Sequence, residues 1–274
     1  MTPPVHTLIL PAAGFGTRMR SVHPTLSKEL LPLGARRVIE YALLEAEDAQ
    51  LTDIVVILRD GKEELKDFLD NCKTTCRLHF TLQQEMNGEG GAILQAREVL
   101  RSLGRDDPFA VLYPDNVGHP APGMLREVCA AFDRTGKDTV ALMRVTPESA
   151  PGIGNAGRVR LDPPRHEFSR SEPPLHPILD FLPKGTGSFP LHGREALRTC
   201  GLFVTLPHFF NFIDMARQQG FSGELTDGKI RRIMLEHGVE FLGVPLSRMV
   251  YDTGNPTGYA KLAALLDPEQ ANAR

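Results

Sequence analysis

A glycine-rich stretch near the start of the chain has the residue types needed to hold a polyphosphate. Residues 10–19 read LPAAGFGTRM, and Lys28 follows ten residues after Arg18, in the run SKELLP. Glycine lets backbone N–H groups approach an anion closely, and arginine and lysine side chains add positive charge. The sequence therefore predicts a local phosphate-binding site to which Arg18 and Lys28 contribute.

Two common phosphate-binding motifs do not fit this stretch. The GxxxxGK[ST] spacing of the Walker loop is absent. The GxGxxG fingerprint of dinucleotide-binding domains lacks its third glycine, and the second predicted strand ends at Leu58-Arg59 rather than at an acidic residue. These departures argue against a dehydrogenase with a dinucleotide fold.

The first half of the chain alternates short apolar runs with helical periodicity. Strands are predicted at residues 7–11, 53–58, 78–82 and 109–113, and helices at residues 37–49, 63–71 and 91–103. This alternation predicts an α/β fold with a mostly parallel central sheet and helices on both faces. Ligands of such sheets bind at the carboxyl ends of the strands, where the glycine-rich turn is expected.

The second half is less regular. Glycine and proline are dense between residues 146 and 190, where only the short strands 158–161 and 177–181 are predicted. The later part of the chain is expected to form a strand at 198–206, helices at 207–219 and 227–237, and a strand at 240–245. A small subdomain is therefore expected after the first half, and residues 267–274 are expected to form a frayed tail.

The composition excludes several classes of protein. Of the 274 residues, 41% are hydrophobic and 24% are charged, which is typical of a globular protein. The formal net charge of -3 argues against nucleic acid as a partner. The longest apolar runs, such as residues 54–58, are too short to span a membrane. The N-terminus has no export-signal pattern, so a cytoplasmic location is expected.

The four cysteines, Cys72, Cys76, Cys129 and Cys200, are too few and too scattered to cross-link a chain of this length. They are interpreted as reduced thiols. Cys72 and Cys76 have CxxxC spacing, but a zinc site needs a second pair of ligands, which His79 alone does not supply.

The glycine-rich stretch and its continuation resemble a known family. The pattern GxGTRM, followed by KExLP with its lysine ten residues after the arginine, resembles the signature of the sugar-phosphate nucleotidyltransferases. The resemblance implies a Rossmann-like nucleotidyltransferase fold in a single domain over residues 1–266. Its nucleotide-binding half would cover residues 1–145 and its sugar-binding half, with the small subdomain, residues 146–266. The implied reaction is transfer of a uridylyl group from UTP to glucose 1-phosphate, with release of pyrophosphate.

Within the motif, the resemblance assigns nucleotide binding to the small residues of the turn, which are Ala13, Gly14, Gly16 and Thr17. Ala13 and Gly14 would contact the base. Arg18 and Lys28 would be catalytic: Arg18 would hold the pyrophosphate leaving group, and Lys28 would contact phosphate.

Two aspartates match the order of the family's metal ligands. Asp115 follows the predicted strand 109–113, and Asp252 lies in the run YDTG near the C-terminus. Either one alone would be interpreted as a turn-forming residue. Together they are expected to bind one Mg²⁺, which keeps its remaining coordination positions for water and phosphate oxygens.

Gln83 resembles the family's base-reading glutamine, and Gly88 lies five residues further on, in a glycine turn expected beside the base. A glutamine amide can pair with both the donor and the acceptor of uracil. Because thymine presents the same pairing edge, transfer from dTTP remains an alternative.

Five residues are expected to contact the sugar substrate, namely Gly157, Asp180, Lys184, Gly201 and Glu224. Gly201 resembles a glycine whose backbone lies against the sugar, and Glu224 begins an ELTD run that is typical of the family. The family's Glu-Lys-Pro segment is altered here, where residues 180–184 read DFLPK. Asp180 would replace the glutamate, and Lys184 would reach the sugar phosphate from a displaced position.

The expected mechanism is an in-line attack by the sugar-phosphate oxygen on the α-phosphorus of the triphosphate. The attacking oxygen is already anionic, so no general base is needed, and Mg²⁺, Arg18 and Lys28 offset the repulsion between the two substrates. The altered segment leaves two alternatives open, which are another sugar 1-phosphate as substrate and a catalytically weakened paralogue that binds nucleotide sugars. A homo-oligomer is expected from the resemblance.

Overall fold

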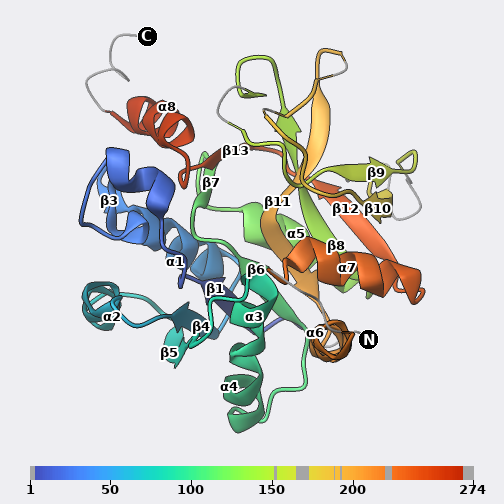
Figure 1. Ribbon diagram of the computed structural model, residues 1–274, viewed down its shortest axis with the longest axis horizontal. Coiled ribbons are helices and arrows are strands. Elements are labelled where there is room, and N and C mark those ends of the chain that lie inside the picture. The colour runs from blue at the N-terminus through green and yellow to red at the C-terminus, as the bar shows by residue number, and fades with distance from the viewer. Residues whose placement is uncertain are drawn as a thin grey trace.

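One large sheet runs through the computed structural model (Figure 1). The structure describes residues 4–150, 153–164, 173–187, 189–191, 193–219 and 224–267. The nine strands of the sheet pair side by side in the order β5 (Arg77–Leu82), β4 (Asp53–Leu58), β1 (Thr7–Pro11), β6 (Phe109–Leu112), β11 (Ala196–Thr205), β8 (Asp138–Val145), β12 (Phe241–Pro245), β10 (His176–Phe181) and β9 (Val159–Leu161).

Most strands of this sheet run in the same direction. β1 pairs in parallel with β4 and with β6, β4 pairs in parallel with β5, and β12 pairs in parallel with β8. β11 and β10 are antiparallel to both of their neighbours, so these two oppose the other seven. The predicted α/β fold with a mostly parallel central sheet is confirmed.

Alternate residues of the strands enter two cores, one on each face of the sheet. In β1, Leu8 and Leu10 belong to the first core and Ile9 to the second. β4 is buried along its whole length and divides its residues in the same way. Central strands covered on both faces are apolar throughout, which explains their continuous hydrophobic runs.

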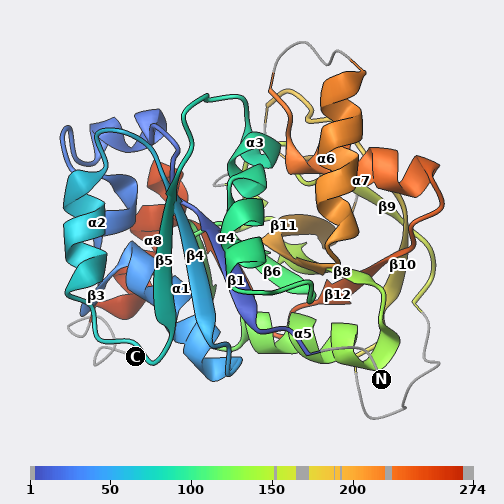
Figure 2. The same ribbon diagram turned by 90° about the horizontal axis from the view of Figure 1, so that it is seen from below.

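Helices cover both faces. The first core packs against α1 (Val38–Asp48), α2 (Glu63–Asp70) and α5 (Met124–Thr135). The second packs against α3 (Glu89–Leu94), α4 (Ala96–Ser102), α6 (His208–Gln218) and α7 (Asp227–Glu236). Figure 2 shows α3 and α4 following each other along the sheet beside β1 and β4.

A two-stranded ribbon brings the C-terminal part of the chain to the end of β6. β7 (Asn116–His119) pairs antiparallel with β13 (Met249–Asp252), and this pairing sets Asp252 opposite Asn116. The chain continues into α8 (Pro256–Leu266), which contacts the small hairpin of β2 (Pro32–Leu33) and β3 (Arg36–Arg37). Figure 1 shows this last helix beside the N-terminal hairpin, so segments from both ends of the chain meet there.

Some elements differ from the sequence predictions. The predicted helix 91–103 is divided into α3 and α4 at Gln95, whose backbone N–H donates to the carbonyl of Ala92 at 2.9 Å in a tightened turn. Seven of the described α-helices and strands have no counterpart in the predictions, namely β2, β3, β7, α5, β8, β13 and α8. β8 is buried at every residue except Arg144, so its sequence has no alternation to mark it.

The tail, the cysteines and the helix lengths complete the description of the fold. Of the predicted frayed tail 267–274, residues 268–274 lie outside the described residues, and the division into two halves stays a prediction. The four cysteines carry no disulfide. None of the described helices has the length and apolar character that crossing a membrane requires.

Candidate active site

The glycine-rich turn leaves β1 at its carboxyl end, as predicted. Gly16 has a φ of 62°, a left-handed conformation that suits glycine, and the 3₁₀ turn Thr17–Ser21 follows it. Backbone N–H groups of residues 13–18 have no acceptor within the described parts of the chain. Ala13 is buried, whereas Gly14 and Thr17 are exposed. The turn therefore presents a row of free backbone donors, as an anion-binding loop requires.

Lys28 lies directly beneath this turn and points at Asp115. A methyl group on Gly16 would lie 3.4 Å from Lys28 Cγ, so the lysine stem packs against the turn. Lys28 Nζ donates to Asp115 Oδ2 at 2.5 Å. Burial by itself lowers the pKa of Lys28, but the negative charges of Asp115 and Glu29 outweigh it and hold this pKa above its ordinary value. Lys28 is therefore a permanent cation at the end of the sheet.

A buried ion pair fixes the backbone that carries Lys28. Lys62 Nζ lies 2.5 Å from Glu29 Oε2 and 2.7 Å from Ser27 Oγ, and the Lys62 and Glu29 side chains are 5% and 1% exposed. The Ser27 hydroxyl also donates to Glu29 at 2.5 Å. Lys62 thus connects the start of α2 to both neighbours of Lys28. The KExLP motif marks Glu29, but nothing in the sequence points to Lys62 as its partner.

Asp115 and Asp252 meet at the end of the β7–β13 ribbon. The backbone N–H of Thr253 donates to the Asp115 carbonyl at 2.7 Å, and Arg18 Nη1 lies 3.8 Å from Asp252 Oδ2. Gly254 packs so closely that a Cβ there would collide with Asp115 Oδ2 and lie 3.1 Å from Asp252 Oδ1. The structure therefore brings together four predicted residues from distant parts of the sequence, namely Arg18, Lys28, Asp115 and Asp252.

The two carboxylates influence each other's charge. Burial raises the pKa of Asp115, but the charges of Lys28 and Arg18 outweigh it and lower this pKa below its usual range. Burial, followed by the negative charge of Asp115, raises the pKa of Asp252, and Arg18 and Lys28 offset this only in part. Two carboxylates that compete for nearby cations are a setting that favours a divalent metal ion.

The donor set fits Mg²⁺ in a substrate-dependent site. Asp115 and Asp252 offer hard carboxylate oxygens, and Asp115 Oδ1 accepts a hydrogen bond from Asn116 at 3.1 Å. Within the described ranges no group of three or more His, Cys, Asp or Glu side chains could hold a metal by itself. Mg²⁺ commonly binds through one or two carboxylates and completes its shell with water and substrate phosphates.

Gln83 is buried and holds the loop that follows it. Its side-chain amide donates to the Asn87 side chain at 3.3 Å and to the Gly88 carbonyl at 3.2 Å. A Cβ on Gly88 would lie 2.8 Å from the backbone of Leu225. The backbone N–H of Leu225 in turn donates to the Asn87 carbonyl at 2.8 Å. The ELTD run is thus attached to the loop expected beside the base.

Gly201 lies in β11 beside the end of β6, and Gly157, which precedes β9, packs against β11 at Thr199. The backbone N–H of Tyr113 donates to the Gly201 carbonyl at 2.7 Å, and a Cβ on Gly201 would collide with the Tyr113 ring. The Thr199 N–H donates to the Gly157 carbonyl at 2.8 Å. These two predicted sugar-side glycines are therefore brought within one short stretch of β11.

The other three residues predicted for the sugar side lie elsewhere. Asp180 Oδ1 lies 3.5 Å from Arg232 Nε on α7. Lys184 is exposed in the loop after β10. Glu224 is exposed at the start of the ELTD run, where its carbonyl accepts a hydrogen bond from Lys229 Nζ at 2.8 Å. Within the described parts of the chain, no hydrogen bond or ion pair joins any of the three to Lys28, Asp115 or Asp252, and their roles stay predictions.

A polar cluster between α3 and α7 was not predicted. Arg231 Nη2 lies 2.6 Å from Asp227 Oδ2, and its guanidinium sits over the rings of Phe181 and Phe203 at 5.0 and 4.7 Å. Burial, with the nearby charges of Asp227 and Glu224, raises the pKa of Glu89 to about 7. The only signal of this cluster in the sequence is the unusual position of Glu89 between two glycines, Gly88 and Gly90.

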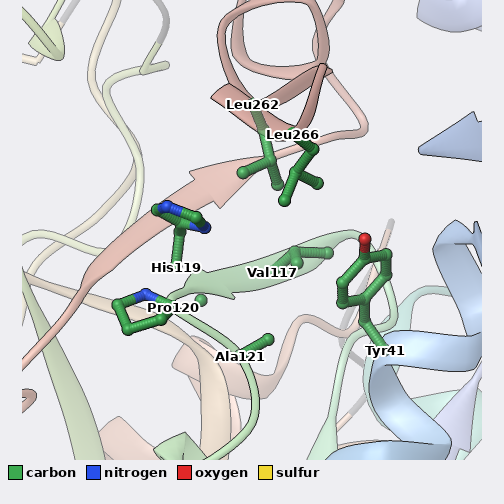
Figure 3. A pocket seen from close by; sticks show the side chains of 8 residues that line it. Tyr41, Val117, His119, Pro120, Ala121, Leu262 and Leu266 are labelled. Atoms are coloured by element: carbon green, nitrogen blue, oxygen red, sulfur yellow. The ribbon is translucent and has the colours of Figure 1, made fainter. Parts of the chain in front are cut away.

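The structure also contains a small apolar cavity, of about 150 Å³, between α1, β7 and α8. Figure 3 shows Tyr41, Val117, Leu262 and Leu266 around it, with His119 on another side. No carboxylate, lysine or arginine side chain lines the cavity. The cavity belongs to the packing beneath α8 and supplies no group to the phosphate-binding turn.

Several known proteins are similar to this chain in sequence or in fold. The chain is 26% identical to the UTP–glucose-1-phosphate uridylyltransferase of Staphylococcus epidermidis, over 96% of this chain and 93% of that protein. It is also 26% identical to the protein of the same name from Bacillus subtilis, over 93% of this chain and 88% of that one. A crystal structure of UDP-glucose pyrophosphorylase complexed with UDP-glucose matches 98% of this chain and 100% of its own, with a TM-score of 0.77 and 20% identity.

The structural match concerns the fold, and it confirms the nucleotidyltransferase fold that the resemblance implied. The match to a family profile covers nearly the whole chain. Residues 6–266 match the family described as nucleotidyl transferase. This protein therefore belongs to the nucleotidyl transferase family.

Proposed function

We propose that this protein transfers the uridylyl group of UTP to glucose 1-phosphate, forming UDP-glucose and releasing pyrophosphate. The observation that carries the proposal is the convergence of Arg18, Lys28, Asp115 and Asp252 at the mouth of the glycine-rich turn. The names of the Staphylococcus and Bacillus relatives support the choice of substrates.

The free N–H groups of residues 13–18 and the two cations would hold the triphosphate. Backbone donors suit the α- and β-phosphates, and Lys28, already fixed against Asp115, needs little reorganisation to contact phosphate. Arg18 is 60% exposed at its side chain and makes only a 3.8 Å contact with Asp252. It is therefore free to close on the departing pyrophosphate.

We propose that Asp115 and Asp252 hold Mg²⁺, which would draw charge from the phosphates when bound. The bond that forms joins the sugar-phosphate oxygen to the α-phosphorus, and the bond that breaks releases pyrophosphate. No residue of this chain has to remove a proton, because the attacking oxygen is an anion. The work of the residues is to align two anions and to offset their repulsion.

Gln83 is proposed to read the base. Its amide nitrogen is engaged with the loop at Asn87 and Gly88, and this holds the side chain in one orientation. This leaves the side-chain oxygen to accept the ring N–H that uracil and thymine share, so dTTP is the alternative nucleotide. A homo-oligomer and a cytoplasmic location are also proposed, on the resemblance and on the sequence.

Pyrophosphate release, measured with Mg²⁺ across a matrix of nucleoside triphosphates and sugar 1-phosphates, tests the proposal. Release should be fastest with UTP and glucose 1-phosphate, should stop when a chelator removes divalent metal, and should return with added Mg²⁺. If pyrophosphate release is fastest with another pair of substrates, the proposed specificity is wrong and the proposed type of reaction stands. No release with any pair, in a protein that still binds UDP-glucose, would favour the weakened paralogue.

A further inference from the structure

The end of β10 supplies no cation for a sugar phosphate. Asp180 is engaged by Arg232, Phe181 is buried beneath Arg231, and Lys184 is exposed in the following loop. A sugar 1-phosphate is a dianion near neutral pH, and it has to approach a triphosphate that is more negative still. A cation from another element would offset this repulsion on the sugar side of the site.

Arg198 on β11 is such a cation. Its side chain is partly buried, and its hydrogen bonds go to two backbone carbonyls, from Nε to Thr199 at 3.1 Å and from Nη1 to Gly154 at 3.3 Å. In the part of the chain that the structure describes, it forms no ion pair with a carboxylate. A guanidinium has five N–H donors, so several remain available for an anion.

The electrostatic setting of Arg198 agrees with this. Burial is the largest influence and lowers the pKa of Arg198 below its ordinary value, and the negative charge of Asp252 opposes this only in part. A partly buried cation that neighbouring carboxylates do not fully balance is stabilised when an anion arrives.

The position of Arg198 fits the direction from which the sugar substrate must come. The hydrogen bond from Tyr113 to Gly201 fixes this part of β11 beside the end of β6, from which Asp115 projects. A Cβ on Gly157 would lie 3.1 Å from Arg198 Nε, so the predicted sugar-side glycine packs directly on the guanidinium. Arg198 thus lies against Gly157 and three residues before Gly201, on a strand that pairs with β6.

We propose that the Arg198 guanidinium binds the phosphate of the sugar 1-phosphate, in the role that the sequence assigned to Lys184. This inference rests on the proposed function. An arginine can bind phosphate through two parallel N–H donors and so fix the orientation of the attacking oxygen, which a lysine point charge does less well.

The test measures binding first, because binding needs no turnover. Isothermal calorimetry would give the dissociation constant of glucose 1-phosphate with a nonhydrolysable UTP analogue and Mg²⁺ present. The Arg198→Met variant should weaken this binding about 10- to 100-fold, and Arg198→Lys should recover part of the loss. Binding of the UTP analogue should change by less than about twofold, because a mere folding defect would weaken both ligands.

Two matched variants complete the test. Lys184→Met removes the competing cation, and Arg232→Met removes a half-exposed arginine that pairs with Asp180. Both should leave glucose 1-phosphate binding within about twofold of the original protein. Unchanged binding in Arg198→Met, or a loss in Lys184→Met comparable to that expected for Arg198, would overturn the inference.

The proposed function can fail separately. If the unaltered protein binds glucose 1-phosphate through Arg198 but releases no pyrophosphate, the reaction is wrong and the phosphate contact stands. If pyrophosphate is released and Arg198→Met keeps its KM for glucose 1-phosphate, the reaction stands and the contact is wrong. An unaltered protein that binds no sugar 1-phosphate at all would overturn both.

Discussion

Lys28 on the nucleotide side is held by a buried ion pair beneath its backbone, whereas Arg198 on the proposed sugar side is held by two backbone carbonyls and the ring of Phe189. The first arrangement is stiff and follows the family motif closely. The arrangement around Arg198 has no ion pair to fix it among the described residues, and it lies on the sugar side, where residues 180–184 depart from the family pattern. We infer from this difference that the proposed triphosphate contacts depend on the family motif, while the proposed contact with the sugar phosphate lies on β11 instead of in the loop after β10.

Removing the buried lysine tests the stiff side and should have the largest effect. Lys62→Met leaves Glu29 buried without its cation, which should lower the free energy of unfolding by about 3–5 kcal/mol in urea denaturation. Lys66→Met, on the same helix, breaks the exposed pair with Asp70 and should cost less than about 1 kcal/mol. Equal stability of the two variants would show that the buried pair does not stabilise the nucleotide side more than an exposed pair does.

A methyl group at Gly201 probes the packing of the sugar side. In Gly201→Ala the new Cβ collides with the Tyr113 ring, and the strain should lower the free energy of unfolding by about 1–3 kcal/mol. Gly154→Ala is the matched control, since a Cβ there meets no atom within 4 Å. Chemical denaturation of both variants would show whether the contact between β11 and β6 is tight, and a stable Gly201→Ala would contradict it.

The smallest expected effect is a pH dependence at Glu89. A raised pKa means that the folded protein binds this proton more tightly, so the stabilisation is complete below the unfolded value of 4.5 and is lost as the pH rises through about 7. Glu89→Gln should therefore melt like the original protein at pH 5 and at a higher temperature at pH 8. Burial of the carboxyl group is incomplete, because solvent reaches the residue and screens its charge, so the gain should be below about 1 kcal/mol.

Thermal melts at the two pH values measure this difference. Glu64→Gln, which removes an exposed carboxylate on α2, serves as the control and should show no such change with pH. A gain for Glu89→Gln that is the same at pH 5 and pH 8 would show that charge is not its cause.

The strand-to-turn segment and the KExLP motif could be predicted because their function depends on local backbone. Gly16 adopts its left-handed conformation within the motif itself, and Lys28 is presented by the next turn of chain. The strands β1 and β4 were also predictable, since their apolar runs are bounded by turn residues. These features need no knowledge of distant contacts.

Other features depend on long-range contacts that a single sequence does not reveal. The approach of Asp252 to Asp115 requires the pairing of β13 with β7, and the resemblance alone pointed to it. The burial of Phe181 beneath Arg231 depends on where α7 packs. Arg198 was not predicted because an arginine within a strand normally has a solvent-facing role, and only the structure shows that it lacks a carboxylate partner among the described residues.

We propose that uridylyl transfer takes place where Lys28 meets the two aspartates. The most direct measurement is the rate of pyrophosphate release from UTP and glucose 1-phosphate by Lys28→Ala, compared with Lys66→Ala as a surface control. We predict that kcat/KM falls by about 10²- to 10³-fold in Lys28→Ala, with a much smaller effect on stability, and is unchanged in the control. A Lys28→Ala protein that is folded and keeps its rate within about twofold would contradict the account.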